Sequence, residues 1–422
     1  MRRWMLPWAV AFAVVLGGSV ASCGGTVATT TGAPTTTGVS TTTSTVPPNT
    51  TSSGQSSTAS TGATGTTHGQ NAPGTAMFRG DLAHTGVYPS GGPTQLHGVL
   101  WKFKTGDAVN SSPAVVDGVV YAASWDGYLY AVDSATGQQK WKFDTGTRSS
   151  VAPMGETLLS SPAVSEGIVY IGSYDGNLYA LDARSGQVRW QFKTGGFIDS
   201  SPAVSEGIVY FGSGDNSFYA VDATTGQERW RFQTGGAVES SPAISNGVAY
   251  FGSDDGYLWA VDVRTALQKW TYPVQGGAVS SPAVADGVVY IGGGDGSLSA
   301  VDTKTGAEMW IFNTQLVVNS SPAVLGGAVY VGSEDNNVYA VDIQTGGEKW
   351  EFVTTGDVHS SPAISGGVLY IGSVDGVLYA IDIQSGNAGW KFSTGGGIES
   401  SPVVVGGVVY FGSGDGYLYA LK

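Results

Sequence analysis

Repeated carboxylates are the residues of this 422-residue sequence that most invite a chemical interpretation. An aspartate followed by glycine or asparagine recurs eight times, at Asp126, Asp175, Asp215, Asp255, Asp295, Asp335, Asp375 and Asp415. Carboxylate oxygens are ligands that Ca²⁺ prefers, so the pattern raises the question of a calcium site. The same dipeptides supply the positive φ angles of tight hairpin turns. Because each aspartate stands at the same place in its repeat, we interpret the set as turns and predict no metal site.

Residues typical of nucleophilic or zinc catalysis are sparse in the sequence. Cys23 is the only cysteine, and the histidines are scattered, at His68, His84, His97 and His359. That spacing does not fit a zinc site. The sequence has no Gly-x-Ser-x-Gly elbow, and no glycine-rich phosphate loop opens a predicted helix. We therefore predict no catalytic residues and no enzyme. An Arg-Gly-Asp triplet at residues 79–81 matches an adhesion motif, and we interpret it as coincidental.

Composition and charge narrow the fold class and the partners. Only 12% of residues are charged, 65 are glycine and 11% are aromatic, which favours a turn-dense all-β protein. Arg2 and Arg3 lie in a segment that we expect to be removed, which leaves 17 bases against 33 acids and a net charge of −16. Since nucleic-acid binding needs a basic face, we predict no nucleic-acid partner.

A repeat of about 40 residues organises most of the chain. The triplet Ser-Ser-Pro recurs with its proline at Pro113, Pro162, Pro202, Pro242, Pro282, Pro322, Pro362 and Pro402, so that one 49-residue step is followed by steps of 40. Each copy contains four strand-like runs, which in the first copy are "SSPAV", "VVYAAS", "YLYAVD" and "WKF". Units of this length with four short strands indicate the blades of a β-propeller. The proline places the first strand at a sheet edge, facing the central channel.

The last copy is incomplete and predicts how the ring closes. Its fourth strand is missing, because the chain ends at "GYLYALK", whereas Leu100–Gly106, "LWKFKTG", is a fourth strand with no blade before it. Tryptophans mark all eight such strands, at Trp101, Trp141, Trp190, Trp230, Trp270, Trp310, Trp350 and Trp390. We therefore predict an all-β, eight-bladed propeller of four-stranded antiparallel blades, closed by an N-terminal strand that completes the last blade.

The residues before each tryptophan carry a family resemblance. "AVDSATGQQKW" and its copies resemble the tryptophan-docking motif of the pyrroloquinoline-quinone-type (quinoprotein-like) propeller repeats, over residues 77–422 and including the lead-in "MFRGDLAHTG". The resemblance implies that the tryptophans dock adjacent blades and are structural. We interpret the aspartate of "AVD" as a turn cap. One copy has Ala266 where the motif has glycine, and we expect a looser turn there.

The N-terminus predicts export and anchoring. Two arginines, an apolar run and small residues form a signal peptide over residues 1–22. Val20-Ala21-Ser22-Cys23 resembles the lipobox of bacterial lipoproteins, which implies lipidation of Cys23; a plain signal peptide or an uncleaved anchor with an incidental Cys23 are the alternatives. Residues 23–76, rich in Thr and Ser, predict a disordered linker after the lipidated cysteine. Residues 77–422 are the propeller.

The variable positions of the repeat give the candidate binding residues. Three residues before each proline, the copies differ while their neighbours stay the same; the polar residues there are Asn110, Asp199, Glu239, Asn319, His359 and Glu399, with Leu159 and Val279 in the other two copies. In a closed ring these side chains surround one mouth of the channel, where relatives that use a cofactor bind their ligands. We predict a binding rim there, against the alternative of a solvated rim without a partner. The extra residues 147–157 are a second candidate loop.

These features predict a non-catalytic, lipid-anchored propeller outside the cytoplasmic membrane that acts as a scaffold or binding module of the cell envelope. Its layout is similar to that of the propeller lipoprotein of the outer-membrane β-barrel assembly machinery. We expect a monomer with envelope protein partners, a membrane contact through the lipid and no cofactor. The alternatives are a quinone-dependent oxidoreductase, which would need pyrroloquinoline quinone with Ca²⁺, and a glycan-binding or sensing module, which would need aromatic residues at the mouth, where we place only Phe197.

Overall fold

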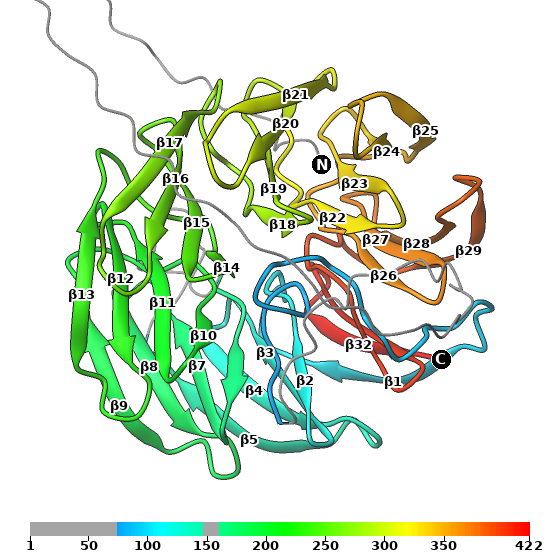
Figure 1. The fold of residues 1–422 in the computed structure, drawn as a ribbon. Coiled ribbons are helices and arrows are strands. Elements are labelled where there is room, and N and C mark those ends of the chain that lie inside the picture. The colour runs from blue at the N-terminus through cyan, green and yellow to red at the C-terminus, as the bar shows by residue number, and fades with distance from the viewer. Residues whose placement is uncertain (1–73, 147–159) are drawn as a thin grey trace, which may run out of the picture. The chain divides into compact units, whose positions relative to one another are not determined.

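Eight four-stranded antiparallel sheets, arranged as blades around a common axis, make up the described part of the chain (Figure 1). The computed structural model describes residues 74–146 and 160–422. Seven sheets are built from four consecutive strands, and the eighth has the order β1-β32-β31-β30, so that the N-terminal strand completes the last blade. The predicted eight-bladed propeller, including its closure, is confirmed. Cys23, the signal peptide, most of the linker and the loop at residues 147–157 lie outside the described ranges.

Each blade has strands A to D from the ring axis outward. Strand A is β2 (Ala114–Val116), β6 (Ala163–Ser165), β10 (Ala203–Ser205), β14 (Ala243–Ser245), β18 (Ala283–Ala285), β22 (Ala323–Leu325), β26 (Ala363–Ser365) and β30 (Val403–Val405). Strand B is β3 (Val119–Ala123), β7 (Ile168–Gly172), β11 (Ile208–Ser213), β15 (Val248–Ser253), β19 (Val288–Gly292), β23 (Ala328–Gly332), β27 (Val368–Gly372) and β31 (Val408–Ser413). Strand C is β4 (Tyr128–Asp133), β8 (Asn177–Asp182), β12 (Ser217–Asp222), β16 (Tyr257–Asp262), β20 (Ser297–Asp302), β24 (Asn337–Asp342), β28 (Val377–Asp382) and β32 (Tyr417–Leu421). Strand D is β5 (Gln139–Asp144), β9 (Val188–Lys193), β13 (Glu228–Gln233), β17 (Gln268–Pro273), β21 (Glu308–Asn313), β25 (Glu348–Val353), β29 (Ala388–Ser393) and β1 (Val99–Lys104).

Strand A is shorter than the sequence predicts, because it begins after the Ser-Ser-Pro triplet instead of within it. The two serines bond sideways to neighbouring blades. The N–H of the second serine donates to the hydroxyl of the second serine in the next blade at 2.9–3.1 Å, through Ser112, Ser161, Ser201, Ser241, Ser281, Ser321, Ser361, Ser401 and back to Ser112. A closed circle of eight hydrogen bonds thus surrounds the axis, and it takes these residues out of their own sheets.

The tryptophans of strand D join each blade to the next. Each indole Nε1–H donates at 2.9–3.0 Å to a backbone carbonyl, which in seven blades lies in the turn between strands C and D of the next blade. The last blade has no such turn, because the chain ends with β32. Trp390 donates instead to the carbonyl of Pro93, upstream of β1, and the Tyr370 hydroxyl donates to the same oxygen. The N-terminal segment therefore supplies a turn as well as a strand.

The turn between strands C and D requires a residue with positive φ close to an indole. At Gly137 φ is 70°, and a Cβ atom would lie 2.7 Å from the Trp101 ring. The aspartate of "AVD" caps this turn as predicted, since Asp133 Oδ1 accepts from the N–H groups of Ala135 and Thr136. Ala266 adopts the same conformation, with φ 58°, and keeps the hydrogen bond from its N–H to the carbonyl of the turn aspartate at 2.9 Å. The expected loosening of this turn is wrong, and the backbone hydrogen bonds of the turn hold the alanine in place.

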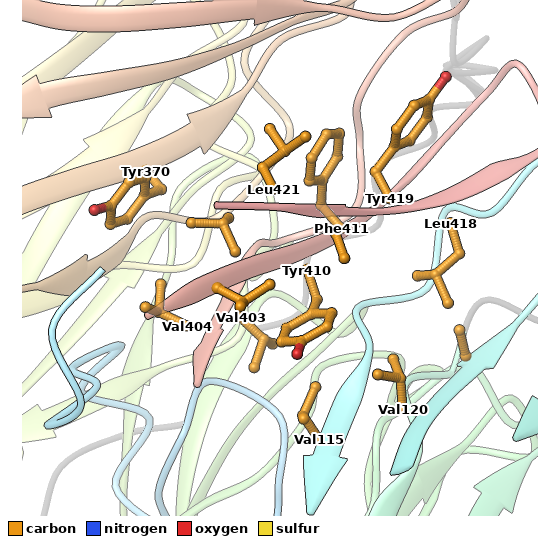
Figure 2. Close-up of a cluster of buried hydrophobic side chains, with 14 of the residues drawn as sticks. Val115, Val120, Tyr370, Val403, Val404, Tyr410, Phe411, Leu418, Tyr419 and Leu421 are labelled. Carbon is orange, nitrogen blue, oxygen red and sulfur yellow. The ribbon is translucent and has the colours of Figure 1, made fainter. Parts of the chain in front are cut away.

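Closure buries apolar side chains between the last blade and the first. β1 pairs antiparallel with β32, and the N–H groups of His97 and Gly98 donate to the carbonyl of Lys422. One buried cluster contains side chains of β30–β32 together with β2, β3 and β4. Figure 2 shows part of it, with Tyr410 and Leu418 of the last blade near Val120 of the first. Burial of such side chains gives the ring closure a hydrophobic contribution of its own.

The segment before β1, residues 76–98, crosses the inner edges of several A strands, and we call it the lead-in segment. Its backbone bonds to the middle residue of strand A in five blades, at Val164, Ile244, Val284, Val324 and Ile364. These groups would otherwise be free strand edges near the axis. Within the described ranges, no helix is long and apolar enough to span a membrane.

Candidate functional site

The two ends of the ring differ in what they carry. Strand A begins at one end, which also holds the turns between strands B and C; we call this end the rim face. The turns between strands A and B lie at the opposite end with the lead-in segment, and we call that end the lead-in face. This assignment follows from the up-and-down order of the strands in every blade.

The predicted rim residues lie on the rim face, where several of them contact other polar side chains. Asn110 Nδ2 donates to Glu399 Oε2 at 2.8 Å, which joins the first blade to the last. Asn319 Nδ2 donates to Glu334 Oε1 at 2.6 Å, and His359 Nε2 lies 3.3 Å from the same oxygen. Glu239 and Glu399 are exposed, whereas the other four are half-buried. The rim is thus partly bonded between blades.

Glu334 belongs to a second variable position, which is not among the residues predicted from the sequence. This position immediately precedes the repeated aspartate and holds Trp125, Tyr174, Gly214, Asp254, Gly294, Glu334, Val374 and Gly414. Its N–H donates to the carbonyl two residues before the rim position, as Trp125 does to Ala108 and Glu334 does to Val317. The two variable positions are therefore neighbours in space. The sequence signal for this position is the same as for the rim position, because the residue varies between copies while its neighbours stay constant.

Aromatic side chains gather on one sector of the rim face. Tyr174 stacks on Phe197, with ring centroids 5.1 Å apart and planes 13° apart. Trp125 occupies the same position as Tyr174 in the preceding blade, and both are half-buried. The expectation that Phe197 is the only aromatic residue at this end is wrong, because turns between strands B and C also reach this face.

Acids occupy the other sector of the rim face. Asp199, Glu239, Asp254, Glu334 and Glu399 come from four different blades, because Glu239 and Asp254 share the blade of β14–β17. Burial, and next the charge of Asp255, raise the pKa of Asp254. Neither variable position holds a lysine or an arginine in any described blade. The rim face therefore combines an aromatic sector with an acidic one, which suits a protein surface that recognises apolar and basic groups.

The repeated aspartates serve the turns. Asp215 Oδ2 accepts from the N–H of Gly195 at 2.8 Å and from the Tyr219 hydroxyl at 2.7 Å, and the following Asn216 has φ 67°. Equivalent contacts recur in other blades. Among the residues that the structure describes, no three His, Cys, Asp or Glu side chains are grouped so that they could hold a metal ion. The interpretation of these aspartates as turn residues is confirmed.

Two polar side chains of the lead-in segment are buried near the axis. The Arg79 guanidinium donates to the carbonyls of Pro362 and Pro322, both at 2.6 Å, and His84 Nδ1 donates to the carbonyl of Pro282 at 3.2 Å. Burial lowers the pKa of Arg79 to about 10. Burial, and next the charge of Arg79, lower the pKa of His84 to about 3, so that the ring is neutral. Arg79 and Asp81 are 3% and 6% exposed, so the Arg-Gly-Asp triplet is not presented for adhesion.

The rim face does not fit pyrroloquinoline quinone with Ca²⁺. The quinone carries three carboxylates, which need basic partners, and the two variable positions offer acids, amides, aromatics and one histidine. The carboxylates that could ligand Ca²⁺ form no group of three among the described residues, and two of the rim amides already engage Glu334 and Glu399. The side chains at the two variable positions thus favour a positively charged ligand over an anionic cofactor.

Comparisons with known proteins agree with this geometry. A family model described as outer membrane protein assembly factor BamB matches residues 97–197, 193–315 and 294–422. Among solved structures, BamB from Moraxella catarrhalis is 22% identical with a TM-score of 0.65, over 77% of this chain and 97% of that chain. Quinohemoprotein alcohol dehydrogenase from Comamonas testosteroni is 18% identical with a TM-score of 0.67, over 82% and 80%. A europium-containing methanol dehydrogenase is 16% identical with a TM-score of 0.71, over 84% and 99%. No curated protein sequence matches significantly. At such identities the similar structures show the fold alone.

Proposed function

Since the chain belongs to the family of the outer membrane protein assembly factor BamB, we propose that it is a non-catalytic scaffold of the cell envelope. It binds its protein partner through the rim face. The observation that carries this proposal is the division of that face into an aromatic and an acidic sector, built mainly from two positions at which the blades differ. The carboxylates common to all blades are used within turns, so we assign partner choice to the variable ones.

The proposed location is outside the cytoplasmic membrane. The tetrad that ends at Cys23 supports lipidation of that cysteine after removal of residues 1–22. The residues between Cys23 and the propeller are rich in Thr and Ser and contain no acid, so they suit a linker between the lipid anchor and the ring.

In-cell crosslinking of the full-length protein, followed by purification and mass spectrometry, tests the scaffold role. The variant carries Asp199→Ala, Glu239→Ala and Glu399→Ala, which remove three acids of the rim face. The matched control carries Glu228→Ala, Glu348→Ala and Glu351→Ala, which remove the same charge from exposed positions on outer strands β13 and β25. We expect a discrete crosslinked partner with the wild type and the control, and its loss with the rim variant. Absence of a partner in all three proteins would contradict the scaffold role.

The aromatic sector favours one second candidate function, a module that binds or senses glycans. Sugars pack on exposed aromatic rings, and Trp125, Tyr174 and Phe197 provide three rings on neighbouring blades. Titration of the purified protein with cell-wall glycan fragments, beside the Trp125→Ala variant, separates the two functions. Saturable binding that the substitution weakens at least tenfold would support a glycan module. Binding of neither protein to glycan would leave the scaffold as the function of this face.

A further inference from the structure

Among the described residues, the lead-in segment bonds through its backbone to five A strands and leaves other inner edges without such a bond, that of β10 among them. Val204 in β10 has the same register position as Val164 in β6 and Ile244 in β14, as each faces the second residue of strand B. Val164 exchanges two backbone hydrogen bonds with Ala76, at 2.7 and 2.9 Å, and the N–H of Ile244 donates to Leu82 at 2.6 Å. Val204 makes no such bond with any described residue of the lead-in segment.

The path of the lead-in segment explains this gap. Between Ala76 and Leu82 the chain turns on itself, with the N–H of Gly80 donating to the carbonyl of Met77 at 3.1 Å. The turn carries the backbone past the blade that contains β10 and returns it to a strand edge only in the following blade. Val115 in β2 also lacks a bond to the described lead-in residues, but it is at Val204 that a cavity adjoins the free edge in this structure.

An open cavity of about 630 Å³ lies over this edge on the lead-in face. Its base is apolar and includes Met77, Tyr170, Val204 and Ile244. Glu166 and Glu206, at the exposed tips of turns between strands A and B, also line it, and no lysine or arginine does. The volume is in the range of sites that bind small ligands or peptide segments.

We propose that this cavity binds an extended peptide segment that carries basic residues beside an apolar one, and that the segment adds a short strand to β10. A free strand edge supplies main-chain hydrogen bonds to such a segment, and the adjoining cavity selects its side chains. The Ala76–Val164 pair shows in the neighbouring blade how a residue exchanges both bonds with this edge. An apolar side chain of the peptide fits the base, and Glu166 and Glu206 attract its basic residues. This site lies on the opposite face from the rim and is independent of the proposed scaffold function.

The direct test measures binding of a labelled peptide, acetyl-Lys-Val-Lys-Val-Lys-amide, to the full-length protein by fluorescence anisotropy. The matched peptide is the same sequence with the amides of its two valines N-methylated, which removes main-chain donors and keeps the charge. We expect the N-methylated peptide to bind at least tenfold more weakly. Equal binding of the two peptides, or no binding of either at 1 mM, would overturn the proposal.

Two protein variants test the role of the acids. Glu166→Gln with Glu206→Gln removes the charge at the cavity, and Asp117→Asn with Asp286→Asn removes it at the same turn position in two other blades. We expect about tenfold weaker binding in the first variant and less than a twofold change in the second. An equal loss in both variants would show attraction to the acidic surface as a whole and would overturn a defined site.

Hydrogen exchange tests whether the edge is already occupied by the protein's own residues. In the free protein we expect the amide of Val204 to exchange faster than that of Ile244, and the peptide to slow it at least tenfold. Protection of Val204 equal to that of Ile244 without peptide would show that another part of the chain pairs with the edge. That result would also overturn the proposal.

Discussion

Each residue of a blade can be compared with the residues at the equivalent position in the other seven blades. The glycine of the turn between strands C and D is one example, because it needs both a positive φ and the absence of a side chain beside the indole of the preceding blade. Ala266 meets the first need at a conformational cost of about 1–2 kcal/mol, since an L-residue is disfavoured in the left-handed region.

Replacing Ala266 by glycine is therefore expected to stabilise the protein by about 1 kcal/mol, after the larger conformational freedom of glycine in the unfolded chain is allowed for. A higher urea midpoint than that of the wild type is the measurement that checks it. Gly346→Ala, which creates the same alanine in another blade, is the matched control and should lower the midpoint. A destabilised Ala266→Gly variant would show that the methyl group makes a packing contribution larger than the backbone cost.

His84 gives the stability a pH dependence whose sign can be stated. Its pKa is about 3 in the folded protein and near 6.5 when unfolded, so the unfolded chain takes up the proton first as the pH falls. The stabilisation is fully present above pH 6.5 and is lost as the pH falls from 6.5 toward 3. At pH 5 the loss reaches about 2 kcal/mol.

Urea midpoints at pH 7 and pH 5 test this for the wild type, His84→Asn and His97→Gln. The asparagine keeps a donor for the carbonyl of Pro282 and does not titrate, so its midpoint should change less between the two pH values. The exposed His97 is the control and should behave as the wild type does. An unchanged pH dependence in His84→Asn would show that other groups govern the acid sensitivity.

At the scale of elements, the serine circle and the indole bonds make two concentric sets of contacts between blades. The inner set lies at the start of the A strands and the outer set at the D strands, so each blade is held to its neighbour at both ends of its sheet. Removing a hydroxyl from the inner set leaves a buried N–H without an acceptor, which costs about 1–3 kcal/mol.

Ser161→Ala is expected to lower the free energy of unfolding by that amount, because the N–H of Ser112 loses its acceptor. Ser393→Ala, at an exposed position at the end of β29, is the control and should change stability by less than 0.5 kcal/mol. Chemical denaturation of both variants checks the prediction. Equal midpoints for the two variants would show that the circle contributes nothing net to stability.

How far the sequence predicted these elements depends on whether copies could be compared. The blade, its turns and the closing strand repeat with a constant spacing, so their pattern was readable. The serine bonds were not, because a strand-like "SSPAV" gives no indication that its first two residues bond to another blade. The lead-in segment occurs once, and Arg79 reaches carbonyls 243 and 283 residues away, so no local pattern could predict its path.

The candidate site shows the same limit. Variation between copies identified Asn110, Asp199 and the other rim positions, and it would also have identified Trp125 and Glu334 had it been applied to the turns between strands B and C. The contact between Glu334 and His359 depends on the distance between adjacent blades. That distance is a property of the closed ring and not of any one repeat.

At the scale of the whole molecule, we expect the N-terminal part to be necessary for a closed monomeric ring. We also expect it to work when it is supplied as a separate fragment. Residues 74–106 supply strand β1, the carbonyl of Pro93 and the cover over five strand edges. A chain of residues 107–422 alone is therefore expected to self-associate through exposed edges. Adding the fragment 74–106 in trans should restore a monomer, which size-exclusion chromatography measures. A stable monomer without the fragment would contradict this role.

The lead-in segment also makes the eight blades different from one another around the axis. A partner could bind a ring of eight identical blades in eight equivalent orientations around the axis. An assembly built on such a ring would have no fixed rotation of the partner relative to the blades. The lead-in segment meets each blade differently, bonding to some, turning away from one and completing another. Each blade thereby has its own position relative to the Ala76–Val164 pair, so that ligands on either face can be held in one fixed orientation to each other.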